Sequence, residues 1–188
     1  MPFDFCKCIM TLCESKQNMN INENNDVKND ILSKLQILET HPIIERINHA
    51  KGINAARDIA QKSLSNKRKV GCVIIDNEKI VSSGYNQVPN CIKNKNCEEN
   101  NKTYWYVLHA EADAILKLIN ENVTLNNPIM YITLSPCKEC AKLILQSGIK
   151  TVIYDEEYKH NESLELLRCA GVYTEKYKSI SSIWININ

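Results

Sequence analysis

The chain has 188 residues, enough for one domain of ordinary size with or without a tail. Its 23 Lys and Arg residues nearly balance its 22 Asp and Glu residues, giving a net charge of +1. This balance argues against a broad basic surface for nucleic acid and against a polybasic membrane anchor.

No apolar run approaches the roughly 18 residues of a membrane-spanning helix, and residues 1–10 lack the pattern of a secretory signal. We therefore expect a cytoplasmic protein. Its nine cysteines are then more readily thiols or metal ligands than a disulfide framework.

The first forty residues differ in composition from the rest. Asparagines crowd a polar stretch over 18–29 that has no apolar period. We expect 1–40 to be a polar, partly disordered N-terminal tail whose three cysteines are ordinary thiols. The folded domain is expected over 41–188.

The first half of this domain predicts a helix followed by a hairpin. Apolar residues recur at helical spacing over about 43–63, after a proline suited to a first turn. A buried strand over 70–75, a polar turn and a return strand over 80–83 follow. Residues 84–106 then predict a long loop, which inside a compact domain is commonly functional.

From residue 109 on, predicted helices and strands alternate. Helices are expected over 110–119, 136–146 and 163–169, and strands over 129–134, 150–154 and 172–174. A helix, a hairpin and this alternation predict an α/β sandwich with a mixed sheet of about five strands. An apolar alternation over 180–187 suggests a further edge strand or a cover for the core.

Two short motifs at predicted helix starts carry the chemistry. The first is His109-Ala110-Glu111, and the second is Pro136-Cys137-Lys138-Glu139-Cys140. Alone, the Cys-x-x-Cys fits half a structural zinc site or a redox pair, and a His-x-Glu is common by chance. Together, in this order and at two helix starts, they predict one zinc site.

The donor set favours a catalytic zinc over a structural one. His109, Cys137 and Cys140 supply one nitrogen and two sulfurs, and a catalytic zinc typically takes three protein ligands and leaves its fourth position to water. The positive ends of two helices favour thiolates and the ionisation of that water. Glu111 lies two residues from His109 and is suited to accept and return the proton.

The two motifs are the signature of the zinc-dependent cytidine and deoxycytidylate deaminase superfamily. The resemblance covers about residues 43–175 and is strongest to the deoxycytidylate (dCMP) deaminase branch, through segments 70–75, 84–86, 106–115, 131–137 and 140–150. It implies a three-layer α/β/α cytidine-deaminase-like sandwich with a central mixed five-stranded sheet. It also implies a homo-oligomer such as a hexamer.

By this resemblance the enzyme converts dCMP to dUMP and ammonia, supplying dUMP for dTMP synthesis. Activated water attacks C4 of the pyrimidine, while Glu111 protonates N3 and carries a second proton to the amino group. The backbone around Ala110 and Ser135 would contact the base, Asn86 would hold the sugar, and Tyr158 would reach the nucleotide. From the residues alone, Asn86 is equally a turn residue.

A 5′-monophosphate needs cationic donors, and two basic clusters are candidates. They are Lys67, Arg68 and Lys69 before the first strand, and Lys93, Lys95 and Lys102 in the long loop. Such clusters are more often solvated faces than sites.

The chain departs from the family pattern at several positions. Gln87 and Asn90-Cys91 stand where the branch commonly has glycines, in a loop that belongs to its nucleotide-triphosphate regulatory site, so regulation by dCTP and dTTP stays open. Asp113 replaces the usual Asn, and its charge would disfavour a nearby phosphate unless a cation compensates it. A second, structural zinc at Cys91, Cys97 and His49 is an alternative that we do not favour.

Other functions remain open on the sequence. A tRNA adenosine, guanine or free-nucleoside deaminase would share the core, but the near-neutral charge argues against an RNA substrate. Free cytidine deaminases normally have Cys where His109 stands. A non-catalytic zinc-binding assembly module would keep the ligands without needing Glu111. We expect a small-molecule nucleotide as partner, and neither nucleic acid nor a membrane.

Overall fold

The computed structural model describes residues 42–158 and 162–179, with side chains from residue 48 on. The expectations for the tail over 1–40 and for the apolar alternation over 180–187 lie outside the described residues. The chain divides into two compact units between Asn48 and His49. The fold and the site described below belong to the second unit.

A five-stranded mixed sheet forms the centre of this unit, with strand order β2-β1-β5-β6-β7. Its strands are β1 (Gly71–Asp76), β2 (Lys79–Tyr85), β5 (Ile129–Leu134), β6 (Thr151–Glu156) and β7 (Tyr173–Lys176). β1 pairs antiparallel with β2 and β5, whereas β5, β6 and β7 run parallel. The predicted mixed sheet is confirmed.

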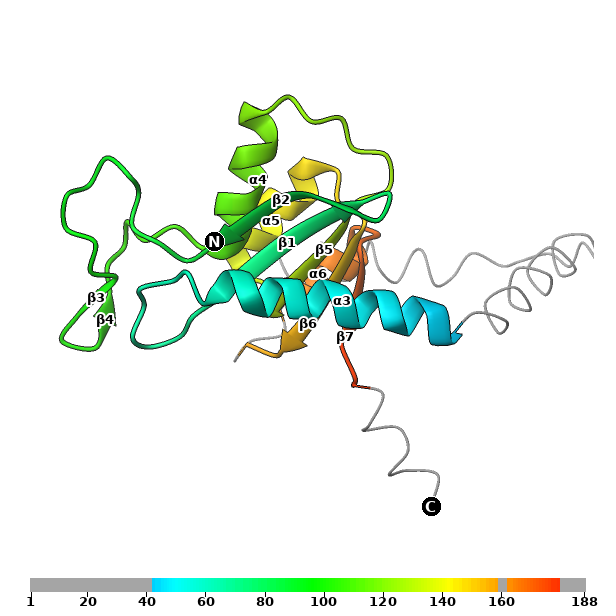
Figure 1. Ribbon diagram of the computed structural model, residues 1–188, viewed down its shortest axis with the longest axis horizontal. Coiled ribbons are helices and arrows are strands. Elements are labelled where there is room, and N and C mark those ends of the chain that lie inside the picture. Colours follow the sequence, from blue (N-terminus) through cyan, green and yellow to red (C-terminus); the bar gives the residue numbers. More distant parts are fainter. Residues whose placement is uncertain (1–41, 159–161, 180–188) are drawn as a thin grey trace, which may run out of the picture. The chain divides into compact units, whose positions relative to one another are not determined.

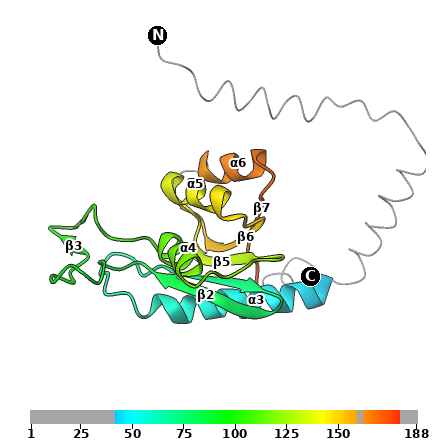
Figure 2. The same ribbon diagram turned by 90° about the horizontal axis from the view of Figure 1, so that it is seen from above.

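Helices cover both faces of the sheet (Figure 2). On one face lies the part of α3 (Pro42–Ala60) that belongs to this unit, whose Ile53 and Ala56 pack with Val73, Tyr131 and Ile153. The other face carries α4 (Ala110–Asn120), α5 (Lys138–Ser147) and α6 (Glu162–Cys169). The predicted three-layer α/β/α sandwich is therefore confirmed, and burial on both faces explains why β1 is an apolar, β-branched run.

One glycine brings the sheet close to the helix that carries the motif His109-Ala110-Glu111. A Cβ atom at Gly84 would lie 2.2 Å from the Ala110 carbonyl oxygen and 2.5 Å from the Ala114 nitrogen. Only a residue without a side chain allows β2 to approach the first turn of α4 this closely. The end of β2 is thereby held beside that turn.

The long predicted loop contains structure that the sequence analysis missed. It carries a small hairpin outside the sheet, made of β3 (Glu98–Glu99) and β4 (Lys102–Thr103) (Figure 1). Asn100 and Asn101 form its turn with φ values of 49° and 61°, a left-handed conformation that asparagine tolerates and that suits two-residue hairpin turns. Strands of two residues are too short to show an alternating pattern.

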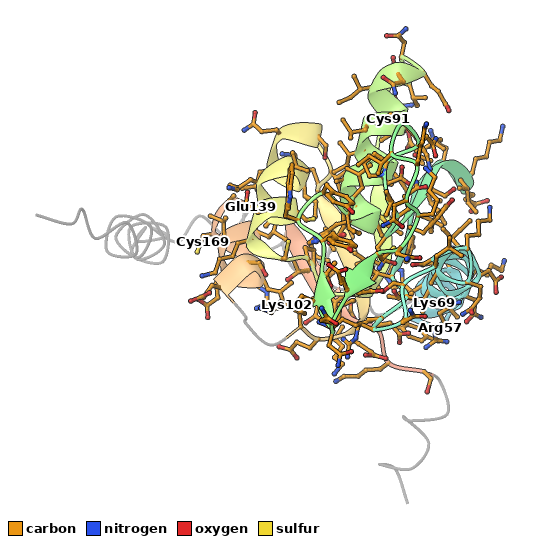
Figure 3. The ribbon with its side chains drawn as sticks, turned by 90° about the vertical axis from the view of Figure 1, so that its left-hand side faces the viewer. Arg57, Lys69, Cys91, Lys102, Glu139 and Cys169 are labelled. Carbon is orange, nitrogen blue, oxygen red and sulfur yellow. The ribbon has the colours of Figure 1, made fainter. Side chains whose placement is uncertain are left out.

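The cysteines of the described residues are all free, and none forms a disulfide. Figure 3 shows two of them, Cys91 and Cys169, at separate places on the molecule. No helix within residues 42–158 and 162–179 combines the length and the apolar character that crossing a membrane requires.

Candidate active site

Two residues stand at the N-caps of neighbouring helices. His109 caps α4 and Cys137 caps α5, both in extended backbone conformations. Neither side chain makes a capping hydrogen bond to its own helix. The imidazole and the thiol are therefore available to each other, and Cys140, one turn into α5, joins them.

The three side chains converge on one point. His109 Nδ1 lies 3.4 Å from the Cys137 sulfur and 3.4 Å from the Cys140 sulfur, and the ligand atoms all lie within 4.8 Å of one another. With Zn–N near 2.0 Å and Zn–S near 2.3 Å, tetrahedral ligands are about 3.5 Å apart. The group fits zinc in both donor type and spacing, and no other such group occurs among the described residues.

The group is already polarised without a metal. Hydrogen bonds from Cys140 and His109 outweigh burial and lower the pKa of Cys137 to about 3. The same contact with Cys137 raises the pKa of His109 above its usual value. Cys137 is thus a thiolate at neutral pH, which is the form that binds zinc.

Glu111 lies in the first turn of α4 and is 4% exposed. Burial raises the pKa of its carboxyl to about 7. A carboxyl with a pKa near the working pH can both accept and donate a proton, as the role of proton shuttle requires.

These residues lie at a cleft of about 400 Å³. The residues that line it are Ser65, Lys67, Arg68, Val70, Asn86, Thr103, Val107, His109, Ala110, Glu111, Leu134, Ser135, Cys137, Glu157 and Tyr158. The structure thus brings His109, Glu111, Cys137 and the four suggested base and sugar contacts together at one cleft, and Cys140, which is buried, joins His109 and Cys137 in the metal-ligand group. Sequence reasoning did not name the other uncharged or acidic lining residues as part of the site, which are Ser65, Val70, Thr103, Val107, Leu134 and Glu157.

Two of the suggested substrate contacts also build the walls of the cleft. Asn86 accepts a hydrogen bond from the Val70 N–H at 2.8 Å and donates from Nδ2 to the Arg68 carbonyl at 2.9 Å. Ser135 Oγ accepts from the Tyr158 N–H at 2.7 Å, and its own N–H donates to the Glu156 carbonyl. Their side chains fix the cleft's shape before any substrate binds.

Only one of the two basic clusters reaches the cleft. Lys67 and Arg68 line it, whereas Lys95 in the long loop donates to the Pro89 and Asn90 carbonyls at 3.1 Å. The ion pair between Arg68 and Glu156, at 3.5 Å, joins exposed groups and is weak.

Aromatic residues before the histidine lie outside the cleft lining. Tyr104 and Tyr106 stack on each other, with ring centroids 5.0 Å apart. Trp105 between them is 93% exposed. They do not wall the cleft in this chain.

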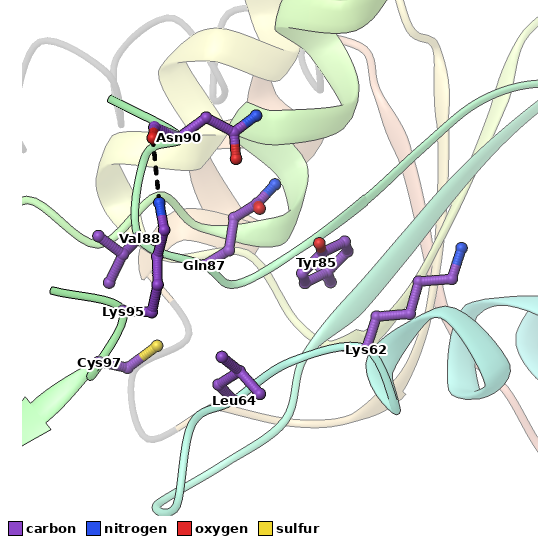
Figure 4. Close-up of a pocket in the computed structure, with 8 residues that line it drawn as sticks. All are labelled: Lys62, Leu64, Tyr85, Gln87, Val88, Asn90, Lys95 and Cys97. Atoms are coloured by element: carbon purple, nitrogen blue, oxygen red, sulfur yellow. Dashed lines mark hydrogen bonds between the residues drawn. The ribbon is translucent and has the colours of Figure 1, made fainter. Parts of the chain in front are cut away.

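A second cavity of about 250 Å³ lies beside the loop where the chain departs from the family pattern (Figure 4). The residues that line it are Lys62, Leu64, Tyr85, Gln87, Val88, Asn90, Lys95 and Cys97.

The alternative of a structural zinc finds no support among the described residues. Cys97 is buried beside Val88 and Val107, Cys91 is exposed, and His49 hydrogen bonds to the Tyr131 hydroxyl instead.

A mixed-sheet α/β/α sandwich, with a His-Cys-Cys group and a buried glutamate at two helix N-termini, defines a zinc enzyme of the cytidine-deaminase-like class. The family model of the cytidine and deoxycytidylate deaminase zinc-binding region matches residues 46–156. The chain belongs to the cytidine and deoxycytidylate deaminase family, whose members are hydrolases that act on C–N bonds.

Several relatives carry the name deoxycytidylate deaminase. The protein of Mus musculus is 38% identical over 147 residues, which cover 69% of this chain and 81% of that protein. The protein of Enterobacteria phage T4 is 33% identical over 176 residues, which cover 69% and 91%. The predicted family is confirmed.

A solved structure shares the fold. The crystal structure of dCMP deaminase from the cyanophage S-TIM5, in complex with dCMP and dUMP, superposes with a TM-score of 0.66. It is 31% identical and covers 72% of this chain and 97% of that one. The cytidine-deaminase-like fold is confirmed by this likeness.

Proposed function

We propose that this protein is a deoxycytidylate deaminase, which converts dCMP and water to dUMP and ammonia. The observation that carries the proposal is the arrangement of one cleft. It contains His109 and Cys137 of the zinc-ligand group together with Glu111, and Lys67 and Arg68 on the segment before β1. The likeness to a dCMP deaminase whose structure contains dCMP and dUMP supports it.

His109, Cys137 and Cys140 would hold the zinc. Bound there, it would supply water acidic enough to act as a nucleophile near neutral pH. Glu111 accepts a proton from this water and delivers it to N3 of the pyrimidine as oxygen adds to C4. It then takes the remaining proton of that water from the oxygen now on C4 and passes it to the exocyclic amino group, the C4–N4 bond breaks, and ammonia leaves as the C4 carbonyl forms.

Backbone groups at the two helix starts would orient the base. The Ala110 N–H is the first of α4 and has no acceptor within its helix, so it can donate to the pyrimidine carbonyl oxygen. The Ser135 N–H is already bonded to Glu156, which leaves the Ser135 carbonyl to accept from the amino group. Asn86 would reach the sugar, and Tyr158 lies 41% exposed where it can cover the nucleotide.

The phosphate would lie against Lys67 and Arg68. Both side chains line the cleft, and each supplies a positive charge with several donors. Asp113, which the sequence marked as an obstacle, does not line the cleft and is paired with Lys117.

Ammonia release from the zinc-loaded protein tests the proposal. The substrates are dCMP, CMP, deoxycytidine, guanine and an adenosine-containing tRNA hairpin, with Glu111→Ala as the blank. We expect dCMP to be turned over well above the others. Faster turnover of an unphosphorylated base or nucleoside, or of the hairpin, would move the chain to another branch of the family.

We further propose that the enzyme is a homo-oligomer, such as a hexamer, and works in the cytoplasm, where its nucleotide substrate occurs. Large apolar side chains left exposed support the first part, with Trp105 at 93% and Ile119 at 65%. The molar mass from light scattering, measured as the protein elutes from a size-exclusion column, tests the oligomer. Cell fractionation tests the location.

A further inference from the structure

The β3–β4 hairpin contacts the segment that carries the basic residues of the cleft. The Ser65 hydroxyl donates to one carboxylate oxygen of Glu98 in β3, and the Asn66 N–H donates to the other oxygen at 3.1 Å. The Arg68 N–H in turn donates to Ser65 Oγ at 3.3 Å. One carboxylate therefore holds the turn that leads into Lys67 and Arg68.

This segment has no regular structure of its own. Residues 63–70 lie between the last turn after α3 and the start of β1, in neither helix nor strand. Two side chains from outside the segment shape it. Asn86 holds the Arg68 and Val70 backbone, and Glu98 holds Ser65 and Asn66.

The Glu98 carboxyl is ionised in this setting. Burial raises its pKa, but the hydrogen bonds from Ser65 and from the Asn66 and Lys67 backbone outweigh burial and leave the pKa below its ordinary value. Hydrogen bonds to a charged acceptor are among the stronger ones in proteins. An ionised Glu98 is therefore a firm anchor for the turn.

Anchoring matters because Lys67 and Arg68 have long, flexible side chains. Ordering such side chains on a mobile backbone costs conformational entropy when a ligand binds. A backbone that is already fixed lowers this cost, and the gain applies only to ligands that use the two cations.

We propose that Glu98 is a positioning residue for the substrate's 5′-phosphate: it fixes the Ser65–Asn66 turn so that Lys67 and Arg68 face the cleft. Glu98 itself does not line the cleft. This inference rests on the proposed function, because it takes a nucleoside monophosphate as the ligand and puts its phosphate against these two cations.

The test compares Glu98→Ala with Glu99→Ala, the adjacent residue of β3, whose carboxylate faces Tyr104 instead. In zinc-loaded protein, calorimetry measures the dissociation constants of dUMP and of deoxyuridine, which differ only by the phosphate. We expect Glu98→Ala to raise the dissociation constant of dUMP about ten-fold and that of deoxyuridine less than about two-fold. Glu99→Ala should leave both within about two-fold.

Kinetics give a second readout. Glu98→Ala should raise KM for dCMP by about the same factor and leave kcat within about two-fold, because it does not touch the reacting atoms. If Glu98→Ala bound dUMP and deoxyuridine more weakly by the same factor, or bound both as wild type does, the proposal would be overturned. Wild-type protein that binds the two compounds equally would overturn it too.

The binding test keeps the two hypotheses apart. A protein that binds dUMP through the phosphate but releases no ammonia from dCMP would refute the proposed function and leave the Glu98 inference standing. If Glu98→Ala does not fold, Glu98→Gln replaces it. That variant keeps one acceptor oxygen and loses the charge. We expect it to bind dUMP more weakly than wild type does, by a smaller factor than Glu98→Ala, with deoxyuridine binding unchanged. An unchanged affinity for dUMP would count against the proposal.

Discussion

Lys117 Nζ donates a hydrogen bond to Oδ2 of Asp113, one turn earlier in α4, at 2.8 Å. The same carboxylate accepts from the Tyr85 N–H at 3.2 Å, and Lys117 also donates to the Ser83 carbonyl at 2.9 Å. The pair therefore ties the helix that carries Glu111 to the end of β2. The negative charge of Asp113, which the sequence suggested would disfavour a nearby phosphate, is compensated by Lys117.

The first prediction concerns this pair. Lys117→Met leaves a carboxylate that is 8% exposed without its cation and should lower the free energy of unfolding by about 1–3 kcal/mol. Adding Asp113→Asn should recover part of the loss, since the neutral amide needs no cation. Urea unfolding of the two single variants and the double variant measures the coupling, and strictly additive effects would contradict it.

The second prediction separates the zinc cysteines from the others. Cys137→Ala removes one of three protein ligands and should abolish zinc binding and deamination together. Cys91→Ala, an exposed cysteine outside the group, should keep both. Metal analysis of dialysed protein checks the first effect, and zinc retained at full stoichiometry in Cys137→Ala would refute the assignment.

A third prediction follows from the contact between β2 and α4. Gly84→Ala puts a methyl group 2.2 Å from the Ala110 carbonyl oxygen, so the strand and the helix must move apart. We expect stability to fall by about 1–3 kcal/mol and kcat/KM for dCMP to fall with it. The control is Ser83→Ala on the same strand, and a Gly84→Ala enzyme with wild-type stability would show that the contact is not tight.

The fourth prediction concerns acid stability. Backbone N–H groups of Asn126 and Asn127 donate to Asp76 at 2.8 and 3.0 Å and lower the pKa of its carboxyl. Its stabilising effect is therefore present above the ordinary carboxyl pKa and is lost as pH falls through the lower, folded value.

The stability difference between wild type and Asp76→Asn should accordingly stay constant from neutral pH to about pH 5 and then shrink as pH falls further to about pH 3. Urea midpoints at several pH values measure it, and Asp58→Asn, exposed on α3, serves as the control. A difference that stays constant over this range would show that the ionised carboxylate is not the stabilising form.

Local patterns were enough to predict the centre of the site. His109, Cys137 and Cys140 could be assigned because their spacing and the two helix starts bring three donors to one point. The centre of the sheet followed for a similar reason, since β1, β5 and β6 carry buried apolar runs. The partner of Asp113 was also within reach, because Lys117 lies four residues further on the same helix.

The basic residues of the cleft were harder to predict. Nothing local distinguishes Lys67 from Lys95, because both lie in irregular segments. Which of them reaches the cleft depends on hydrogen bonds that the backbone N–H groups of Val70 and Asn66 donate to Asn86 and Glu98, residues distant in the sequence. Contacts of this kind leave no periodic pattern, so the structure was needed to find them.

The central claim is that Glu111 shuttles protons for the deamination of dCMP at a zinc held by His109, Cys137 and Cys140. Its most direct test is the rate of ammonia release from dCMP by wild type and by Glu111→Gln, with zinc content measured on both samples. We expect the variant to keep its zinc and to lose about 10²–10⁴-fold in kcat. A variant that keeps both its zinc and most of its activity would contradict the account.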